Sequence, residues 1–503
     1  MTETTAVGDA THRYLQALRD RPSRPIDWSA APPTYQRYPT EGRIVLPWRS
    51  SEPTGRLLRD LLGLTRAYWV HPTDQAGQPT VGPPEVRLGR PAPSGGALYP
   101  IEAYLATAGP TAGLYHYDAA HHCLDQVRPG DHRAALTGLL AQRPVRLPEL
   151  LLVLSAVFWR NGFKYGDFAY RLHCQETGVL TAQALALAEA LDRALTVHLR
   201  FAQRKTEGLL GLDGVGEGAL AILALAPPHN RHDTPSELPS YTDLLARPAA
   251  QAVPQPTPVS KLLPHLTALH RAAGKPTGTP ATVRSPARPP QVRQPPVSLP
   301  KPQPRQLSEG VAHRASPPNG FLPAHTHLVT LATVLAAATA GYPGDLPGTH
   351  RTPATVTPYL LIRRVAGIPP GAYWYDAGTH ALFRTGDADA PGLVARGPLQ
   401  PNTRPALGEC AAVLIPAGDP LAGVDAFGDR WYRVQQIEAG LLMHRATLAA
   451  TAHGLTARIH SDGTNDTTDA ALGLAGTRQR SLSFLTLGKP RPGCLRDAGS
   501  ATA

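Results

Sequence analysis

The sequence predicts an α+β fold made of two copies of one unit within a single chain. Short sequence words recur in the same order in both halves, and each half combines apolar strand-like runs with one long apolar helix. The length of 503 residues also exceeds what one ordinary hydrophobic core supports. We therefore expect two units, each with an antiparallel or mixed sheet, flanking helices and a buried central helix.

The recurring words keep a nearly constant spacing. GLYHYD at 113–118 returns as GAYWYD at 371–376, an offset of 258. An offset of 262 relates three further pairs, which are GDFAYR and GDRWYR at 166–171 and 428–433, ETG and EAG at 176–178 and 438–440, and GL at 211–212 and 473–474. Ordered self-similarity indicates a structural repeat. We expect the copies to form an intrachain pseudo-dimer around central helices at 176–195 and 438–450.

Hydrophobic periodicity predicts the elements of the first copy. Residues 11–18 and 56–66 have apolar side chains at helical spacing, and 176–195 is apolar on most faces, as a buried helix is. Strand-type runs lie at residues 101–108, 113–118, 147–159 and 219–226. The predicted boundaries are an N-terminal arm at 1–50, a catalytic unit at 51–230, a linker at 231–320 and a degenerate second unit at 321–494.

Residues 251–325 hold most of the excess charge. They contain 17 prolines and nine Lys or Arg against one acid, so they contribute +8 of the formal net charge of +11. Such a segment cannot bury enough apolar surface to offset its ordering entropy, and we expect a flexible linker with one short helix at 261–273. No basic helix or interleaved aromatic stripe accompanies the charge, so nucleic-acid binding is not expected.

Other function classes lack their sequence patterns. The four cysteines are far apart, without the Cys/His spacing of a zinc site, and we expect no metal. The first residues show no charged-then-apolar signal, and no apolar run reaches the ~18 residues of a membrane span. We expect a cytoplasmic protein without membrane or nucleic-acid partners.

A glycine-rich loop is the first candidate for chemistry. It follows Arg90 and contains Pro93-Ser94-Gly95-Gly96. Because glycine has no Cβ, the backbone at Gly95 and Gly96 can approach a flat ligand and present N–H groups to it. The same word also forms ordinary turns, so it is weak evidence by itself.

The second candidate is FWRNGFKYGD at 158–167, where an apolar strand-like run ends in Arg160, Lys164 and Tyr165. Polar residues at such a position are often functional. A Lys beside a Tyr can serve as a general base. The alternative is a solvated loop in which Lys164 pairs with Asp167 on the surface.

These words, taken in order, resemble the SagB-type dehydrogenases of the nitroreductase superfamily. The matching runs are DWSAAPPTYQRYPTEGRIVLP, SGGALYPIEAYL, GLYHYD, FWRNGFKYGDFAYR, ETGVLTAQALALAEAL and LLGLDGVGE. The resemblance covers residues 26–230 well and 325–490 as a worn second copy. It implies a nitroreductase-like α+β fold with FMN at a dimer interface, and oxidation of thiazoline or oxazoline rings to azoles in a ribosomally made peptide.

The resemblance also assigns roles to residues. Lys164 and Tyr165 match the family's catalytic pair, and Pro93, Ser94, Gly95 and Gly96 match the word that lies against the flavin. The further cofactor-binding candidates are Arg90, Arg160 and Arg171.

The chain departs from the nitroreductase pattern in one respect. An Arg-Ser-x-Arg run that would hold the FMN phosphate is absent near 50–66, where WRSSEPTGR is a poor version. A phosphate dianion needs cationic or N–H partners, so we expect them from the second copy, among Arg351, Arg363, Arg364 and Arg433.

The second copy itself lacks the candidate chemistry. Ala426 and Phe427 stand near the positions that match Lys164 and Tyr165, and TPAT at 352–355 replaces the glycine-rich word. The sequence therefore predicts one complete active site per chain.

Three functions remain open at this point. The first is an azoline dehydrogenase acting on a precursor peptide, with a cyclodehydratase complex as a further partner. The second is a nicotinamide-dependent nitro, quinone or ene reductase of the same fold. The third is a scaffold without catalytic activity in a peptide-modifying complex.

Overall fold

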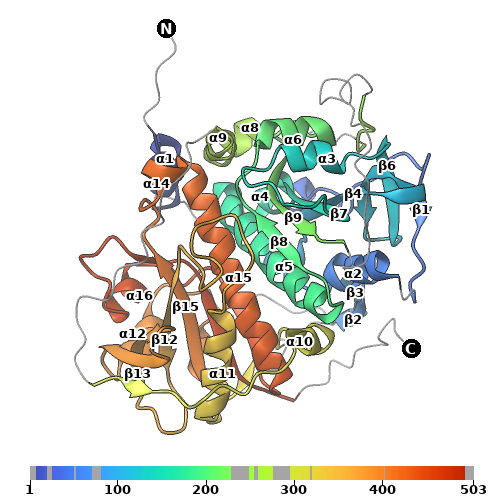
Figure 1. The fold of residues 1–503 in the computed structure, drawn as a ribbon. Helices are drawn as coiled ribbons and strands as arrows, with labels where there is room; N and C mark the ends of the chain where they lie inside the picture. Colours follow the sequence, from blue (N-terminus) through green and yellow to red (C-terminus); the bar gives the residue numbers. More distant parts are fainter. Residues whose placement is uncertain are drawn as a thin grey trace.

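The computed structural model describes residues 7–19, 25–49, 52–70, 81–227, 248–253, 259–275, 295–317, 320–400 and 403–492. Two sheets lie on either side of a central pair of long helices, α5 (Ala169–Ala190) and α15 (Arg430–Ala452), which run side by side (Figure 1). This arrangement confirms the predicted α+β fold of two units that form an intrachain pseudo-dimer.

The sheet of unit 1 has the strand order β1-β6-β5-β4-β7-β9-β8. Its strands are β1 (Ile44–Val45), β4 (Ile101–Thr107), β5 (Gly113–Asp118), β6 (Cys123–Pro129), β7 (Leu150–Val157), β8 (Leu195–His198) and β9 (Glu217–Leu225). All neighbouring strands pair antiparallel. A separate hairpin, β2 (Arg66–Val70) and β3 (Glu85–Gly89), leads into the glycine-rich loop.

The sheet of unit 2 repeats this order as β14-β13-β12-β15-β18, extended by β10 and β11, with β16 on β18 and β17 on β15. Its strands are β10 (Val297–Ser298), β11 (Phe321–Leu322), β12 (Thr357–Ile362), β13 (Gly371–Asp376), β14 (Ala381–Gly386), β15 (Ala412–Gly418), β16 (Thr456–His460), β17 (Arg480–Ser481) and β18 (Phe484–Pro490). The matching order shows that the repeated words mark equivalent elements.

Helices complete both units. In unit 1 they are α1 (Asp9–Arg19), α2 (Pro53–Leu62), α3 (Arg133–Gly138), α4 (Phe158–Tyr165) and α6 (Gln203–Leu210), with one-turn helices η1 (Trp28–Ala30), η2 (Gly95–Ala97), η3 (Gly109–Thr111) and η4 (Gly166–Phe168). In unit 2 they are α11 (Leu328–Ala338), α12 (Ala390–Arg396), α13 (Thr403–Glu409), α14 (Val424–Phe427) and α16 (Asp466–Ala471).

Two predicted boundaries in unit 1 were wrong. The helix expected at 176–195 begins at Ala169 and ends at Ala190, because the chain turns at Asp192, where φ is +53°, before β8. The strand expected at 147–159 ends at Val157, and the next residues form α4. Lys164 and Tyr165 therefore lie in the last turn of a helix.

The repeated glycines lie where the two central helices approach most closely. A Cβ on Gly178 would lie 1.9 Å from the Ile437 carbonyl oxygen, and one on Gly440 would lie 1.9 Å from the Gln175 carbonyl oxygen. Only glycine permits two helix backbones to pack this closely. The ETG and EAG words thus record the symmetric contact on which the pseudo-dimer is built.

The proline-rich segment packs against both units in its described parts, which corrects the expectation of a wholly flexible linker. The helix expected at 261–273 is present as α8 (Val259–Leu262) and α9 (Pro264–Ala273), with Leu266 and Leu269 buried in the core of unit 1. Further on, β10 pairs with β14, and α10 (Leu307–His313) lies against α15 and α5.

The N-terminal arm also bridges the units. The N–H and hydroxyl groups of Thr11 in α1 both donate to the Asp429 carboxylate, each at 2.8 Å.

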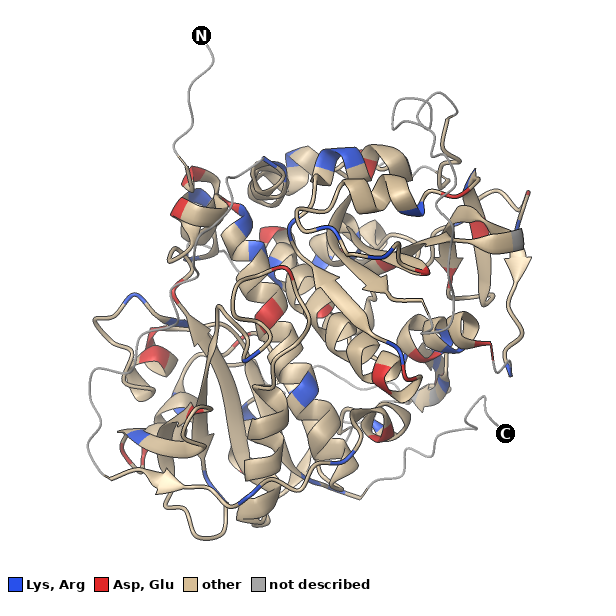
Figure 2. Ribbon diagram, in the orientation of Figure 1, with Lys and Arg blue, Asp and Glu red and all other residues tan. Residues whose placement is uncertain are grey.

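Acidic and basic residues are interspersed over both units rather than gathered on one side (Figure 2). None of the described helices is long and apolar enough to span a bilayer.

Candidate functional site

A buried carboxylate from α5 holds the glycine-rich loop. Glu176 accepts hydrogen bonds from the Ser94 hydroxyl at 2.8 Å and from the Gly95 N–H at 3.3 Å. The Ser94 oxygen in turn accepts the Tyr99 N–H at 2.8 Å. Burial raises the pKa of Glu176 to about 7, although these hydrogen bonds oppose the shift.

Gly96 brings this loop against the end of α4. Its φ is +69°, and a Cβ there would lie 2.8 Å from the Tyr165 hydroxyl and 3.4 Å from Lys164 Nζ. Ala97 and Tyr99 also have positive φ, at 55° and 48°. Such backbone conformations are costly outside glycine and cluster at functional sites. The two segments that the sequence singled out therefore meet.

Lys164 is half-buried at this junction. Its ammonium lies 5.3 Å from the ring centre of Trp28 and 5.3 Å from that of Tyr165. Burial lowers the pKa of Lys164 from its ordinary value. The Asp167 carboxylate accepts the Leu266 N–H at 2.7 Å, which is not the surface pairing with Lys164 that was the alternative.

Two buried arginines flank Tyr99 next to the loop. Arg160 donates from Nη1 to the Tyr99 carbonyl oxygen at 2.8 Å, and the guanidinium of Arg90 lies 4.9 Å from the Tyr99 ring. Their exposed fractions are 1% and 2%. Nε and Nη2 of both side chains have no hydrogen-bond partner among the described residues. Buried donors without partners are costly, and these N–H groups can therefore bind an acceptor.

Two further arginine candidates, Arg171 and Arg433, cross the interface in opposite directions. Arg171 of unit 1 donates to the carbonyl oxygens of Ser481 and Leu482 in unit 2. Arg433 of unit 2 donates to Gln203 at 2.8 Å and to the Ala219 carbonyl at 3.2 Å in unit 1.

Arg433 thus contacts α6 and β9 of unit 1 rather than the glycine-rich loop. Arg364 contacts carbonyl groups of its own unit, at Gly408 and Cys410.

The second copy keeps the framework of the site without its reactive groups. Gly166 after α4 has φ 59° and ψ −148°, and Gly428 after α14 has φ 58° and ψ −151°. This match places Ala426 and Phe427 at the positions of Lys164 and Tyr165. Glu438 repeats the role of Glu176, since it accepts the Thr355 N–H and hydroxyl, both at 2.6 Å.

Sequence reasoning missed four residues around the loop. Glu176 appeared only as part of a repeat, and Trp28 only in the arm. Arg314, assigned to the linker, donates from Nε to the Pro91 carbonyl oxygen at 2.5 Å. Glu102 contacts Arg160 through an ion pair. A carboxylate inside the apolar strand IEAYLAT is a signal that identifies Glu102 from sequence.

Comparisons with known proteins agree with this architecture. The chain is 25% identical over 234 residues to the trifolitoxin-processing protein TfxB of Rhizobium leguminosarum bv. trifolii, covering 44% of this chain and 60% of that protein. It is 35% identical over 111 residues to the microcin B17-processing protein McbC of Escherichia coli, covering 20% and 41%. The chain thus spans less than two thirds of these relatives' lengths.

A solved structure matches the chain across both units. The crystal structure of a nitroreductase candidate from Anabaena variabilis superposes with a TM-score of 0.76 at 22% identity, over 96% of this chain and 99% of that one. No family model matches the sequence. Its ordered motifs, its sequence relatives and its fold nevertheless agree: the chain resembles the SagB-type, nitroreductase-like proteins and is built as a tandem repeat, with Lys164 and Tyr165 in its first copy alone.

Proposed function

We propose that this protein is an FMN-dependent dehydrogenase that oxidises azoline rings to azoles in a ribosomally made peptide. The observation that carries the proposal is the meeting of Lys164 and Tyr165 with Gly96 of the glycine-rich loop, beside buried arginine donors. The names of two relatives, a trifolitoxin-processing and a microcin B17-processing protein, support a peptide substrate. A cyclodehydratase complex that makes the azoline is the expected partner.

The residues present suit a flavin. Any side chain at Gly96 would fill the space between the loop and the Tyr165 hydroxyl, and such space is expected where backbone lies against a flat ring. Arg90 and Arg160 offer buried N–H groups that have no partner among the described residues, and such groups suit the phosphate or the ring oxygens of FMN. The bound flavin would supply a hydride acceptor. The loop of Pro93, Ser94, Gly95 and Gly96 would hold its ring.

Lys164 is the proposed base. An azoline carries an acidic ring proton next to a carbonyl, and its removal needs an uncharged amine within hydrogen-bond reach. Burial lowers the pKa of Lys164, which enlarges the uncharged fraction near neutral pH. Tyr165 stands beside it and can share the proton through its hydroxyl. The Trp28 ring also lies 5.3 Å from the Lys164 ammonium.

The test separates cofactor binding from chemistry. The purified protein should be yellow, and mass spectrometry of the released cofactor should identify FMN. With a synthetic thiazoline peptide and oxygen, loss of two hydrogens from the peptide reports turnover. Lys164→Ala should keep its flavin and lose roughly 10²–10⁴-fold in rate, the usual contribution of a general base.

The second copy provides the matched control. Ala426→Lys, introduced together with Lys164→Ala, should restore nothing, because the loop of that copy lacks the Ser-Gly-Gly word. Unchanged turnover by Lys164→Ala would refute the role of Lys164. Rapid flavin reduction by NAD(P)H without azoline oxidation would favour the reductase, and a colourless protein would favour the scaffold.

A further inference from the structure

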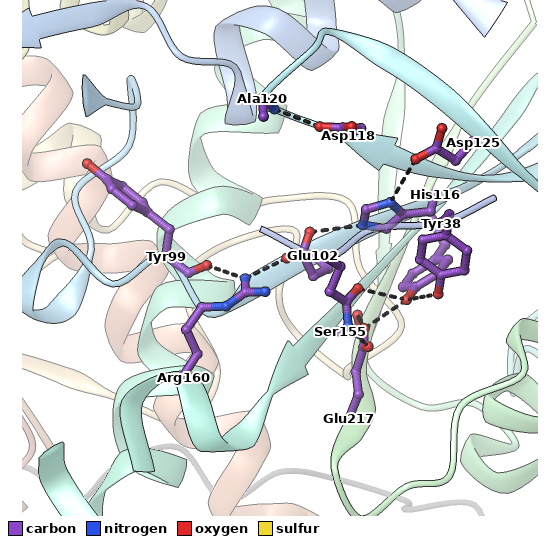
Figure 3. A network of polar contacts seen from close by, with 12 residues as sticks. Tyr38, Tyr99, Glu102, His116, Asp118, Ala120, Asp125, Ser155, Arg160 and Glu217 are labelled. Atoms are coloured by element: carbon purple, nitrogen blue, oxygen red, sulfur yellow. Dashed lines mark hydrogen bonds and ion pairs between the residues drawn. The ribbon is translucent and has the colours of Figure 1, made fainter. Parts of the chain in front are cut away.

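A line of alternating charges runs from the candidate site into the sheet of unit 1 (Figure 3). Arg160 forms an ion pair with Glu102 on β4, and Glu102 accepts His116 Nε2 on β5 at 3.0 Å. On the far side of the ring, His116 Nδ1 lies 4.0 Å from the Asp125 carboxylate on β6. Arg43 closes the line with a 2.6 Å contact to Asp125.

The pKa shifts of Glu102 and His116 favour the charged form of both groups. Burial alone would raise the pKa of Glu102, but Arg160 and His116 outweigh it and hold the pKa at about 2. Burial opposes charge on the His116 ring, but Asp125 and Glu102 raise its pKa to about 9. The other groups facing the ring are Tyr38, stacked at 4.7 Å, Tyr104 at 5.3 Å and the Glu217 carboxyl.

The second copy shows that the sheet folds without this line. Tyr104 pairs with His116 across the strands as Tyr359 pairs with Trp374, which fixes the equivalent positions. On this register, Glu102, His116 and Asp125 correspond to Thr357, Trp374 and Phe383. The rings of Trp374 and Phe383 pack 5.1 Å apart in place of the charges. Buried ion pairs add little stability compared with apolar packing, so stability alone does not account for these charges, and the end of the line nearest the site is Arg160.

We propose that Glu102, backed by His116, is a positioning residue that orients Arg160 toward the bound flavin. The proposal rests on the function proposed above and names a residue that the resemblance does not assign. Glu102 and the Tyr99 carbonyl both engage Nη1 of Arg160, which leaves Nε and Nη2 for the ligand. Fixing a guanidinium in advance spares the cost of ordering it when the ligand binds.

The test measures FMN affinity of the flavin-free protein by fluorescence titration, together with its thermal unfolding. Glu102→Gln keeps the shape and removes the charge, and should weaken FMN binding roughly tenfold, because a charge-assisted hydrogen bond to Arg160 becomes a weaker neutral-acceptor bond. Glu217→Gln is the matched control. Glu217 is a buried carboxyl in the same sheet that contacts Tyr104 and Ser155, and its counterpart in unit 2 is Gln479, which already accepts the Tyr359 hydroxyl at 3.4 Å. The FMN affinity of the Glu217→Gln variant should stay at the wild-type value.

A double-mutant cycle decides whether Glu102 acts through Arg160. Glu102→Gln should add nothing to the loss caused by Arg160→Gln, whereas independent effects would multiply. Additive losses, or wild-type affinity in Glu102→Gln, overturn the proposal while leaving the role of Lys164 intact. Failure of the wild-type protein to bind FMN overturns the proposed function and this inference together.

A second variant covers the case in which Glu102→Gln does not fold. His116→Gln keeps a donor to Glu102 and removes the imidazolium, so it should weaken FMN binding in the same direction and lose this effect in the Arg160→Gln background. Wild-type FMN affinity in His116→Gln would overturn the proposal that His116 supports Glu102.

Discussion

The closest approach of the two units should be sensitive to a single methyl group. In Gly178→Ala, the new Cβ would lie 1.9 Å from the Ile437 carbonyl oxygen and 2.8 Å from the Leu441 nitrogen. Ordinary contact begins at 3.4 Å, so α5 and α15 must separate by about 1.5 Å (3.4 minus 1.9). Both neighbours are backbone atoms, which cannot rotate away. We expect an overpacking cost of about 3 kcal/mol.

Helix propensity opposes this cost and can be measured separately. Alanine is better than glycine in a helix by about 1 kcal/mol, so the net destabilisation of Gly178→Ala should be about 2 kcal/mol. Gly408→Ala in α13 is the control, because a Cβ there has no described neighbour within 4 Å, and it should be stabilised by up to about 1 kcal/mol. Urea denaturation followed by circular dichroism compares the midpoints. If Gly178→Ala were as stable as Gly408→Ala, the glycine contact would not hold the units together.

Three further predictions concern the site and the linker. Gly96→Val should lose flavin because its side chain would meet Tyr165. Gly109→Val should keep flavin, since it has a similar φ of +75° and no neighbour within 4 Å among the residues that the structure describes. Equal flavin retention in the two purified variants would refute the proposed contact between Gly96 and the flavin. Because the pKa of Glu176 is raised from 4.5 to about 7 in the folded state, its stabilising effect is complete below pH 4.5 and is lost as the pH rises to 7. The melting temperature should therefore fall over this pH range, and Glu176→Gln should flatten the fall. An unchanged pH profile of the melting temperature in Glu176→Gln would contradict this prediction. Cleavage at a protease site placed between residues 281 and 290 should leave both fragments eluting together with bound flavin, since α5 and α15 join the units; separation on a sizing column would refute this.

The repeat and the unequal chemistry of the two copies could be read from the sequence because both are local patterns. The spacing of GDFAYR and GDRWYR, and the replacement of Lys164 and Tyr165 by Ala426 and Phe427, need no knowledge of contacts. The glycine-rich word and the Lys-Tyr pair were recognised separately. Their proximity is a property of the fold, because η2 precedes β4, α4 follows β7, and β4 pairs with β7.

Local patterns failed where packing decides the outcome. An apolar run such as LLLVLSAVFW has the same composition in a strand or a buried helix, so the change from β7 to α4 at Phe158 could not be placed. Proline content suggested a free linker, yet Leu266 and Leu269 bury against unit 1. The location of Arg433 depends on how the units cross, which no spacing reveals.

The sequence by itself determined that this protein has two copies of one unit and that only the first carries Lys164, Tyr165 and the Ser-Gly-Gly loop. Only the tertiary structure decided which charged side chains lie next to these site residues. Glu102, His116 and Asp125 lie on three different strands, and they form one line because the cross-strand register sets them side by side. Register is set by the packing of whole sheets. A charge far from the site in sequence can therefore act on it, as we propose for Glu102 through Arg160.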